Sequence, residues 1–159
     1  MFFKPKEEKK RLTVNRGDPN NPLASYSKHT FELDGYEWPS VEHYYQAMKF
    51  GDAEYAKQIR QAATPTDAVK LGKSRQHDKR KDWDKIKVTV MTRGTYIKCR
   101  TYPDIAQTLL DSGDIDIADL SQYDYFWGSG RDMRGHNAYG HMLMDIRNKL
   151  AEEEQQKKS

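Results

Sequence analysis

The segment that decides the fold reads Trp38-Pro-Ser-Val-Glu-His-Tyr-Tyr-Gln-Ala-Met-Lys-Phe50. Ser40 follows a proline and is a typical N-cap residue, so a helix is predicted to begin here. Its apolar side chains recur at helical spacing and form one stripe, which consists of Val41, Tyr44, Tyr45 and Met48. A second, polar stripe follows the i, i+4, i+7 pattern and consists of Glu42, Gln46 and Lys49. The pattern therefore predicts a helix that aligns a carboxylate, an amide and an ammonium group on one face.

Short strands and further helices are predicted on both sides of this helix. Apolar residues alternate over residues 31–38 around Asp34-Gly35, and Asp-Gly is the strongest short-range signal for a β-hairpin. The remaining pattern predicts a loop over 15–22, helices over 52–63, 66–72, 83–97, 103–113 and 138–150, a short strand near 115–120 and a loop over 124–137. The predicted fold class is mainly α (α+β), with several helices and a small β-hairpin.

The length and the ends of the chain indicate one domain. The sequence has 159 residues, and no Gly-, Ser- or Pro-rich linker divides it. We expect a disordered basic tail over residues 1–11, a domain over 12–150 and a charged tail over 151–159 that frays from the last helix.

The composition excludes several classes of protein. The longest apolar runs span only a few residues, too short for a membrane-spanning helix, and no secretory signal pattern follows the charged N-terminus. Cys99 is the single cysteine, which excludes an internal disulfide framework and a cysteine-based zinc site. The 27 Lys and Arg against 24 Asp and Glu give a net charge of +3, too small to demand a nucleic-acid partner. We therefore expect a cytoplasmic protein with no membrane partner, no cofactor and no metal.

Two clusters, residues 38–50 and 124–137, carry the side chains that could perform chemistry. The sequence contains no Gly-x-Ser-x-Gly elbow, no P-loop and no His-Glu-x-x-His motif. By residue type alone, the members of the two clusters also have ordinary structural roles. Glu42 then favours the helix dipole, Asp124 forms a turn, Trp127 fills the core and Asn137 caps a helix.

In combination, these segments resemble the NADAR family of YbiA-like N-glycosidases over residues 23–150. The resemblance is carried by the Asp34-Gly35 hairpin, the 38–50 segment, Gly72 with Arg75, Arg80 to Trp83, Lys87, Met91, Lys98, Asp124-x-x-Trp127-Gly-x-Gly130, Gly135, Asn137, Gly140 and Leu143-Met144. Two segments depart from the family pattern. Lys98-Cys99 stands where the family usually has Lys-Phe, and Leu23-Ala-Ser-Tyr26 replaces a Leu-Ser-Asn-Phe-like stretch that tends to line the pocket. These departures bear on the choice of substrate.

The resemblance implies an N-glycosidase that hydrolyses a ribosyl C–N bond. Members of the family cleave phosphorylated ribosylamino-pyrimidine intermediates of riboflavin synthesis, or are linked to NAD and ADP-ribose, including ADP-ribose on guanine. Such a reaction leaves positive charge on the sugar, so it requires a carboxylate near the anomeric carbon and a proton donor near the leaving group. Glu42 is expected to stabilise this charge or activate water, and Asp124 to act as the second acid or to position ribose hydroxyls. Which carboxylate takes which role stays open.

Substrate-binding roles follow from the parts of such a substrate. A base can stack on Trp127, Trp83 or Tyr44, and Asn137 can hydrogen-bond a base edge or a hydroxyl. Phosphate requires cations or backbone N–H groups, for which the candidates are Lys49, Arg75, Arg80, Lys81, Arg131, Arg134 and the loop with Gly128 and Gly130. Structural alternatives remain open, with Trp83 as a core residue, residues 73–81 as a solvated basic loop and His43 as a packed histidine instead of a proton carrier.

Two other functions also remain open. The first is a non-catalytic ADP-ribose/NAD-binding module, which has the same pocket but performs no hydrolysis. The second is a nucleic-acid-binding protein that uses the basic loop and tails, and an enzyme acting on ADP-ribosylated DNA would share part of this behaviour. The main expected partner is a small phosphorylated ribosyl or ADP-ribosyl substrate.

Overall fold

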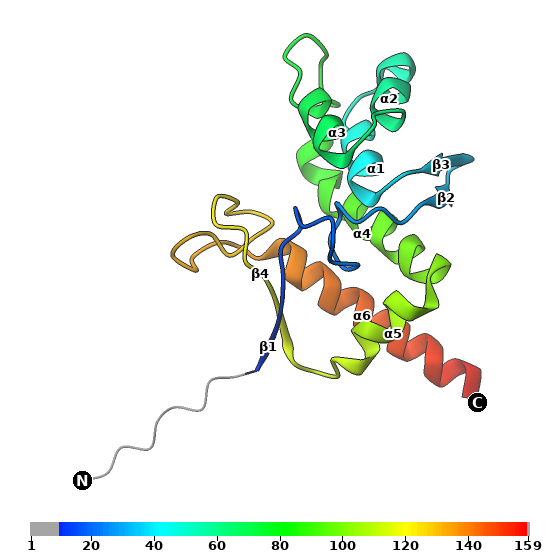
Figure 1. Cartoon of the computed structure of the whole chain (residues 1–159), viewed down its shortest axis with the longest axis vertical. Coiled ribbons are helices and arrows are strands. Elements are labelled where there is room, and N and C mark those ends of the chain that lie inside the picture. The colour runs from blue at the N-terminus through cyan, green and yellow to red at the C-terminus, as the bar shows by residue number, and fades with distance from the viewer. Residues whose placement is uncertain (1–9, 159) are drawn as a thin grey trace.

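Six helices and two small two-stranded sheets form residues 10–158, the part of the chain that this computed structural model describes (Figure 1). In chain order the elements are β1 (Arg11–Val14), β2 (Phe31–Leu33), β3 (Tyr36–Trp38), α1 (Val41–Ala47), α2 (Ala53–Arg60), α3 (Pro65–Gly72), α4 (Trp83–Thr101), α5 (Pro103–Asp111), β4 (Asp116–Asp119) and α6 (Ala138–Lys158). The long helix α4 contacts α1, α5, α6 and β2. The predicted mainly α (α+β) class is confirmed. No helix within residues 10–158 is long and apolar enough to cross a membrane.

The predicted hairpin is present and determines where α1 begins. Strands β2 and β3 pair antiparallel, and the turn residues Asp34 and Gly35 have φ angles of 56° and 84°. Trp38 at the end of β3 packs edge-on against Tyr44 of α1, with 5.2 Å between ring centroids. Ser40 then caps α1, because its Oγ accepts a backbone N–H of the first turn at 3.1 Å. The N-cap expected from the sequence is confirmed.

A parallel pairing joins the first strand to the last, and the sequence pattern did not indicate the first strand. Strand β1 pairs with β4 over its whole length. Arg11 begins β1, which corrects the predicted tail over residues 1–11, and residues 1–9 lie outside the described residues. Because parallel strands end at the same edge, the segments that follow them, residues 15–27 and 120–137, come together (Figure 1).

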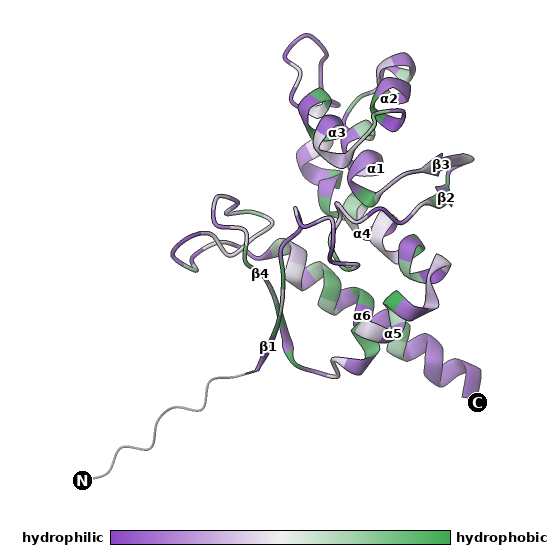
Figure 2. Ribbon diagram, in the orientation of Figure 1, coloured by the Kyte–Doolittle hydropathy of each residue, from purple (hydrophilic) through white to green (hydrophobic). Residues whose placement is uncertain are grey.

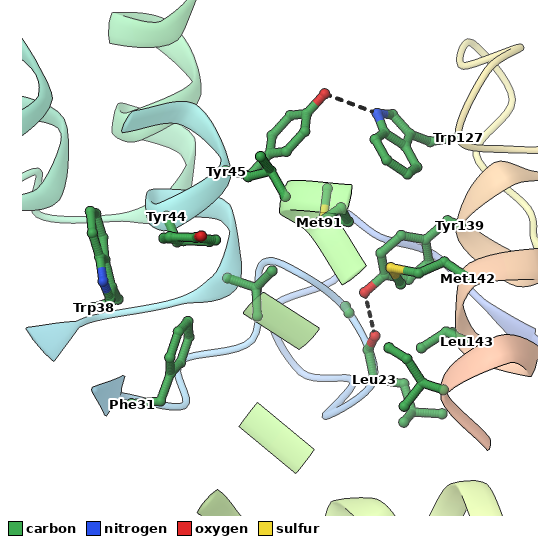
Figure 3. Packing of buried hydrophobic residues seen from close by; sticks show 14 of the residues in the cluster. Leu23, Phe31, Trp38, Tyr44, Tyr45, Met91, Trp127, Tyr139, Met142 and Leu143 are labelled. Carbon is green, nitrogen blue, oxygen red and sulfur yellow. Dashed lines mark hydrogen bonds between the residues drawn. The ribbon is translucent and has the colours of Figure 1, made fainter. Parts of the chain in front are cut away.

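The buried core lies between α1, α4 and α6 and is rich in aromatic rings (Figure 3). The Tyr139 hydroxyl of α6 donates to the Leu23 carbonyl at 2.6 Å, which fixes the 15–27 segment to that helix. Gly94 lets α1 approach α4, since a Cβ at this position would lie 2.9 Å from the Tyr44 ring. The core therefore holds α1 and the 15–27 segment in fixed positions relative to each other.

The predicted boundaries hold for most elements. Helix α2 ends at Arg60, earlier than the predicted residue 63, and α3 begins at Pro65 with Thr64 as its N-cap. Helix α6 continues to Lys158, where a fraying tail was expected from residue 151, and this end is coloured hydrophilic in Figure 2. Residues 73–81 form no helix, as expected, and are mostly exposed.

Candidate functional site

Two members of the predicted polar stripe, Glu42 and Gln46, are buried on α1, whereas Lys49 lies beyond the end of the helix and is half-buried. Glu42 is fully buried, and its Oε1 accepts the Gln46 side-chain N–H at 2.7 Å. The Ser25 hydroxyl donates to Glu42 Oε2, also at 2.7 Å. Gly72 of α3 provides the space for this arrangement, because a Cβ there would lie 1.9 Å from Gln46 Oε1. The α1–α3 contact thus orients the amide that holds the Glu42 carboxylate.

Arg16 is the residue around which the site is organised, and the sequence analysis did not identify it. It lies in the loop after β1, and its Nη1 donates to Glu42 Oε2 at 2.5 Å. Its Nη2 lies 3.8 Å from Asp124 Oδ2, in the segment after β4. The strand pairing therefore brings Glu42 and Asp124, which are 82 positions apart in the numbering, to the same guanidinium group.

Three aromatic rings enclose the Arg16 guanidinium. Its Cζ lies 5.8 Å from the ring centroids of Tyr45 and Trp127 and 5.9 Å from that of Tyr26. The Trp127 indole N–H donates to the Tyr45 hydroxyl at 3.2 Å, as Figure 3 shows, so two of the rings hold each other in place. Trp83 is buried and packs behind Tyr45 at 5.0 Å between centroids, which makes it a supporting core residue.

The pKa values of the groups in this cluster differ from their ordinary values because the groups are buried and interact with one another. Burial acts to raise the pKa of Glu42, but the Arg16 charge and the bonds from Ser25 and Gln46 outweigh it, so the net pKa is lowered. Burial raises the pKa of Tyr45 to about 12. Burial lowers the pKa of Lys49 to about 8, and its Nζ lies 5.5 Å from the Tyr45 ring centroid. The cluster thus combines an ionised pair with an amine whose pKa is lowered to about 8.

Asp124 both forms a turn and faces the site. Its Oδ1 accepts the backbone N–H groups of Phe126 and Trp127 at 3.1 and 2.8 Å, which is the structural role expected for this residue. Its Oδ2 faces Arg16, and the side chain is 31% exposed. One carboxylate oxygen therefore positions Trp127, while the other faces Arg16 on a side chain that is partly exposed.

The glycines of the 120–137 segment are required for packing. A Cβ at Gly128 would lie 2.8 Å from the Ser121 carbonyl, and Gly130 has a φ of 74° with its missing Cβ position 2.4 Å from the Tyr125 ring. The Gly130 N–H already donates to the Ser121 carbonyl at 3.2 Å. This contact corrects the prediction that the Gly130 N–H is available to a phosphate group.

Two predicted substrate contacts, Tyr44 and Asn137, do not join the cluster. Tyr44 points from α1 toward Trp38 instead of toward Trp127, as Figure 3 shows. The Asn137 amide accepts the Asp119 N–H at 2.8 Å and donates to the Ile117 carbonyl at 2.9 Å. Tyr44 is therefore a core residue, and Asn137 fixes the edge of β4 to the start of α6.

A cationic groove of about 500 Å³ opens beside Lys49. Its lining includes Lys49, Gly72, Lys73, Ser74, Arg75, His77, Asp78 and Lys79. Arg75 therefore lies where a phosphate could be bound. Arg80 does not line the groove, and its guanidinium is paired with Asp82, with two contacts of 3.0 Å at an exposed position.

In the described part of the chain, His43 and Cys99 form no side-chain hydrogen bond with Arg16, Glu42 or Asp124. The His43 Nδ1 lies 2.7 Å from the Ser40 hydroxyl and its Nε2 lies 3.0 Å from the Ala62 carbonyl, so it is a packed histidine. Cys99 is buried, and burial raises the pKa of its thiol to about 11. Within residues 10–158, no three His, Cys, Asp or Glu side chains are grouped so that they could hold a metal ion.

Three curated proteins are similar to this chain over most of its length. The N-glycosidase YbiA of Escherichia coli is 31% identical over 134 residues, which cover 84% of each chain. The N-glycosidase Npun_R5314 of Nostoc punctiforme is 36% identical over 135 residues, which cover 83% of this chain and 86% of that protein. The riboflavin biosynthesis protein PYRR of Zea mays is 33% identical over 143 residues, which cover 80% of this chain and 23% of the maize protein.

The fold and the family model agree with these similarities. The NMR structure of E. coli YbiA matches with a TM-score of 0.83 and 28% identity, covering 92% of this chain and 88% of that one. The family model of the NADAR domain matches residues 1–151, which include every strand and the first two thirds of α6. The chain therefore belongs to the NADAR domain family.

Proposed function

We propose that this protein is an N-glycosidase that hydrolyses the bond between a ribosyl anomeric carbon and a nitrogen. The observation that carries this proposal is the convergence of Glu42 and Asp124 on Arg16 inside an aromatic enclosure. The names of the relatives support it, because two are called N-glycosidase and a third is called a riboflavin biosynthesis protein. The proposed substrates are phosphorylated ribosylamino-pyrimidines or ADP-ribose linked to guanine.

The two carboxylates have different roles in this proposal. Both oxygens of Glu42 are occupied, Oε2 by Arg16 and Ser25 and Oε1 by Gln46. Asp124 Oδ2 accepts no hydrogen bond from the described residues, and the Asp124 side chain is partly exposed. Glu42 therefore orients Arg16, while Asp124 Oδ2 faces the sugar and stabilises the positive charge that develops on it.

The proposed reaction is an attack of water on the anomeric carbon. A proton of the water passes to Asp124 Oδ2, and the electron pair of the C–N bond passes to the departing nitrogen. That nitrogen takes its proton from the Lys49 ammonium group. Burial lowers the pKa of Lys49 to about 8, so at neutral pH it carries a proton and is a stronger acid than an exposed lysine.

The cationic groove supports a substrate with phosphate. Lys73, Arg75 and Lys79 line it together with Lys49, so the groove continues directly from the proton donor. Arg75 and the lysines supply fixed positive charge, and Asp78 is the one carboxylate among the described residues that line the groove. A phosphate bound there would lie beside Lys49, whose Nζ is 5.5 Å from the centroid of the Tyr45 ring that borders Arg16.

Turnover of defined substrates tests the proposal. Purified protein is incubated separately with a ribosylamino-pyrimidine phosphate, ADP-ribosylated guanosine and NAD, and the released base is measured by chromatography. The Asp124→Asn variant retains the turn-forming oxygen but loses the charge, and we expect its turnover to fall by about 10²- to 10⁴-fold. Asp114→Asn, at an exposed position away from the site, is the matched control.

The alternative is a binding module with the same pocket. Calorimetry with ADP-ribose and with a ribosylamino-pyrimidine phosphate decides between them. Binding that depends on Arg75 but yields no free base from any of the substrates would favour the module and reject hydrolysis.

A further inference from the structure

One wall of the site is formed by the segment 22–27, which has no helix or strand. Its residue Ser25 donates its hydroxyl to Glu42 and accepts the Glu42 backbone N–H at 2.9 Å. The next residue, Tyr26, supplies one of the three rings around Arg16, and its N–H donates to the Arg16 carbonyl at 3.2 Å. The position of this wall therefore determines the position of the Arg16–Glu42 pair.

A single buried ammonium group holds this wall from behind. Lys98 of α4 is fully buried, and its Nζ donates to the Pro22 carbonyl at 2.7 Å, the Ala24 carbonyl at 3.0 Å and the Ser27 hydroxyl at 3.1 Å. These three bonds use all three N–H groups of the ammonium. Within residues 10–158, Lys98 forms no ion pair with a carboxylate.

A buried charge without a counter-ion is unfavourable for folding, and a methionine would fill the same volume without that penalty. The feature that requires an ammonium is the geometry of its acceptors. Three oxygens from six consecutive residues point at one centre. Within the segment, the Ala24 carbonyl also accepts the Ser27 N–H at 3.1 Å, and the Pro22 carbonyl accepts the Ser27 hydroxyl at 3.4 Å. A methionine side chain has no N–H donor, so it would leave the three oxygens without this common partner.

We propose that Lys98 is a positioning residue for the active site. It gathers the 22–27 segment around its ammonium group and so sets the position of Ser25 and Tyr26 against Arg16 and Glu42. Its effect on turnover rests on the proposed N-glycosidase function, whereas its effect on the wall does not.

The charge of Lys98 makes this wall sensitive to pH. Burial lowers the pKa of Lys98 to about 8. The neutral amine has only two N–H groups, so after deprotonation Lys98 can donate to only two of the three acceptor oxygens. The titratable groups that face this region are His29, Cys99, Asp104 and Tyr139. Burial and the Lys98 charge lower the pKa of His29, which lies beside the segment.

Rising pH has opposite effects on the wall and on the stability of the whole fold, because deprotonation of Lys98 loosens the wall but does not lower the free energy of unfolding. The folded pKa of Lys98 lies below its unfolded value, so the unfolded chain binds more protons between the two values. The free energy of unfolding therefore rises with pH across that interval. Activity that falls over the same interval therefore cannot come from loss of the fold through Lys98. Deprotonation of the proposed proton donor Lys49 contributes to the same fall, so the effect of Lys98 on the wall is measured by resonance signals of the wall itself.

Turnover of a Lys98→Met variant tests the proposal, with Lys85→Met, an exposed lysine on the same helix, as control. We expect kcat to fall about 10- to 100-fold with little change in KM, because ångström-scale misplacement of positioned groups has this size of effect. Circular dichroism confirms the fold of both variants. Unchanged kcat in a folded Lys98→Met protein would overturn the proposal.

Nuclear magnetic resonance of the wild-type protein tests the wall without any substrate. We expect the Ala24 methyl signal to titrate near pH 8, to do so still in Lys49→Met, and not to titrate in Lys98→Met. The pKa of His29 is expected to rise in Lys98→Met. Two results would reject the role of Lys98. In the first, the Ala24 signal no longer titrates in Lys49→Met, and in the second, it does not titrate in the wild type. This arm decides the question even if Lys98→Met does not fold or if no substrate is turned over.

Discussion

The Arg16–Glu42 pair allows a quantitative double-mutant test. Arg16→Met leaves a fully buried carboxylate without its cation, and breaking one partner of such a pair lowers the free energy of unfolding by about 4 kcal/mol. Glu42→Gln retains an oxygen that can accept from Ser25, and Arg16 is 15% exposed, so we expect a smaller loss of about 2 kcal/mol.

The double variant separates pairing from packing. Additivity would predict a loss of about 6 kcal/mol, but with neither charge present we expect about 3 to 4 kcal/mol, a coupling of roughly 2 to 3 kcal/mol. Urea unfolding measured by tryptophan fluorescence gives all four values, and Trp127 beside Arg16 reports on the site itself. Additive losses would refute the view that the pair acts as a unit.

The contribution of Glu42 to the free energy of unfolding depends on pH with opposite signs in the wild type and in Arg16→Met. In the wild type, the lowered folded pKa of Glu42 contributes stability above its unfolded pKa, and this contribution is lost as pH falls through the folded value. Without Arg16, burial alone would raise that pKa. Stability from Glu42 would then be present at low pH and lost as pH rises through the raised value. We expect Arg16→Met to become more stable relative to wild type from pH 7 to pH 5. A constant difference between the two profiles would contradict this account.

Two further predictions concern packing. Tyr45→Phe removes the hydroxyl that accepts the buried Trp127 N–H, and thermal unfolding should show that the free energy of unfolding falls by about 1 to 3 kcal/mol. Tyr44→Phe should change turnover little, because Tyr44 lies away from the cluster. Gly140→Ala would place a Cβ 2.2 Å from a β4 carbonyl, and we expect it to lower the unfolding temperature strongly, whereas Gly51→Ala, which meets nothing within 4 Å, should not. Equal unfolding temperatures for the two glycine variants would contradict the contact between β4 and α6.

The local elements could be predicted from the sequence because their signals are short-range. Asp34-Gly35 specifies its hairpin by backbone conformation, and Ser40 specifies the helix start by its hydroxyl. Glu42 and Asp124 were identified as candidate acids, and the geometry brings both to Arg16. These features depend on a few neighbouring residues, which a pattern can show.

The long-range features could not be predicted in this way. Arg16 lies in a loop without periodicity, and its partners come from α1 and from the segment after β4. Polar and apolar residues alternate in β1, but four residues directly after a charged run are too few to identify a strand, and nothing in them indicates the parallel partner β4. Tyr44 and Tyr45 are neighbours in one apolar stripe, but only the crossing of α1 over α4 at Gly94 determines which ring faces the site.

The parallel pairing of β1 with β4 has a consequence for the order in which the protein is made. A ribosome synthesises β1 early, yet its hydrogen-bonding partner does not exist until residues 116–119 have emerged. A nascent chain halted before that point could already form α1 through α4, but it would lack both β4 and Asp124. Catalytic competence should therefore arise late in translation and in one step, after the helical scaffold is in place.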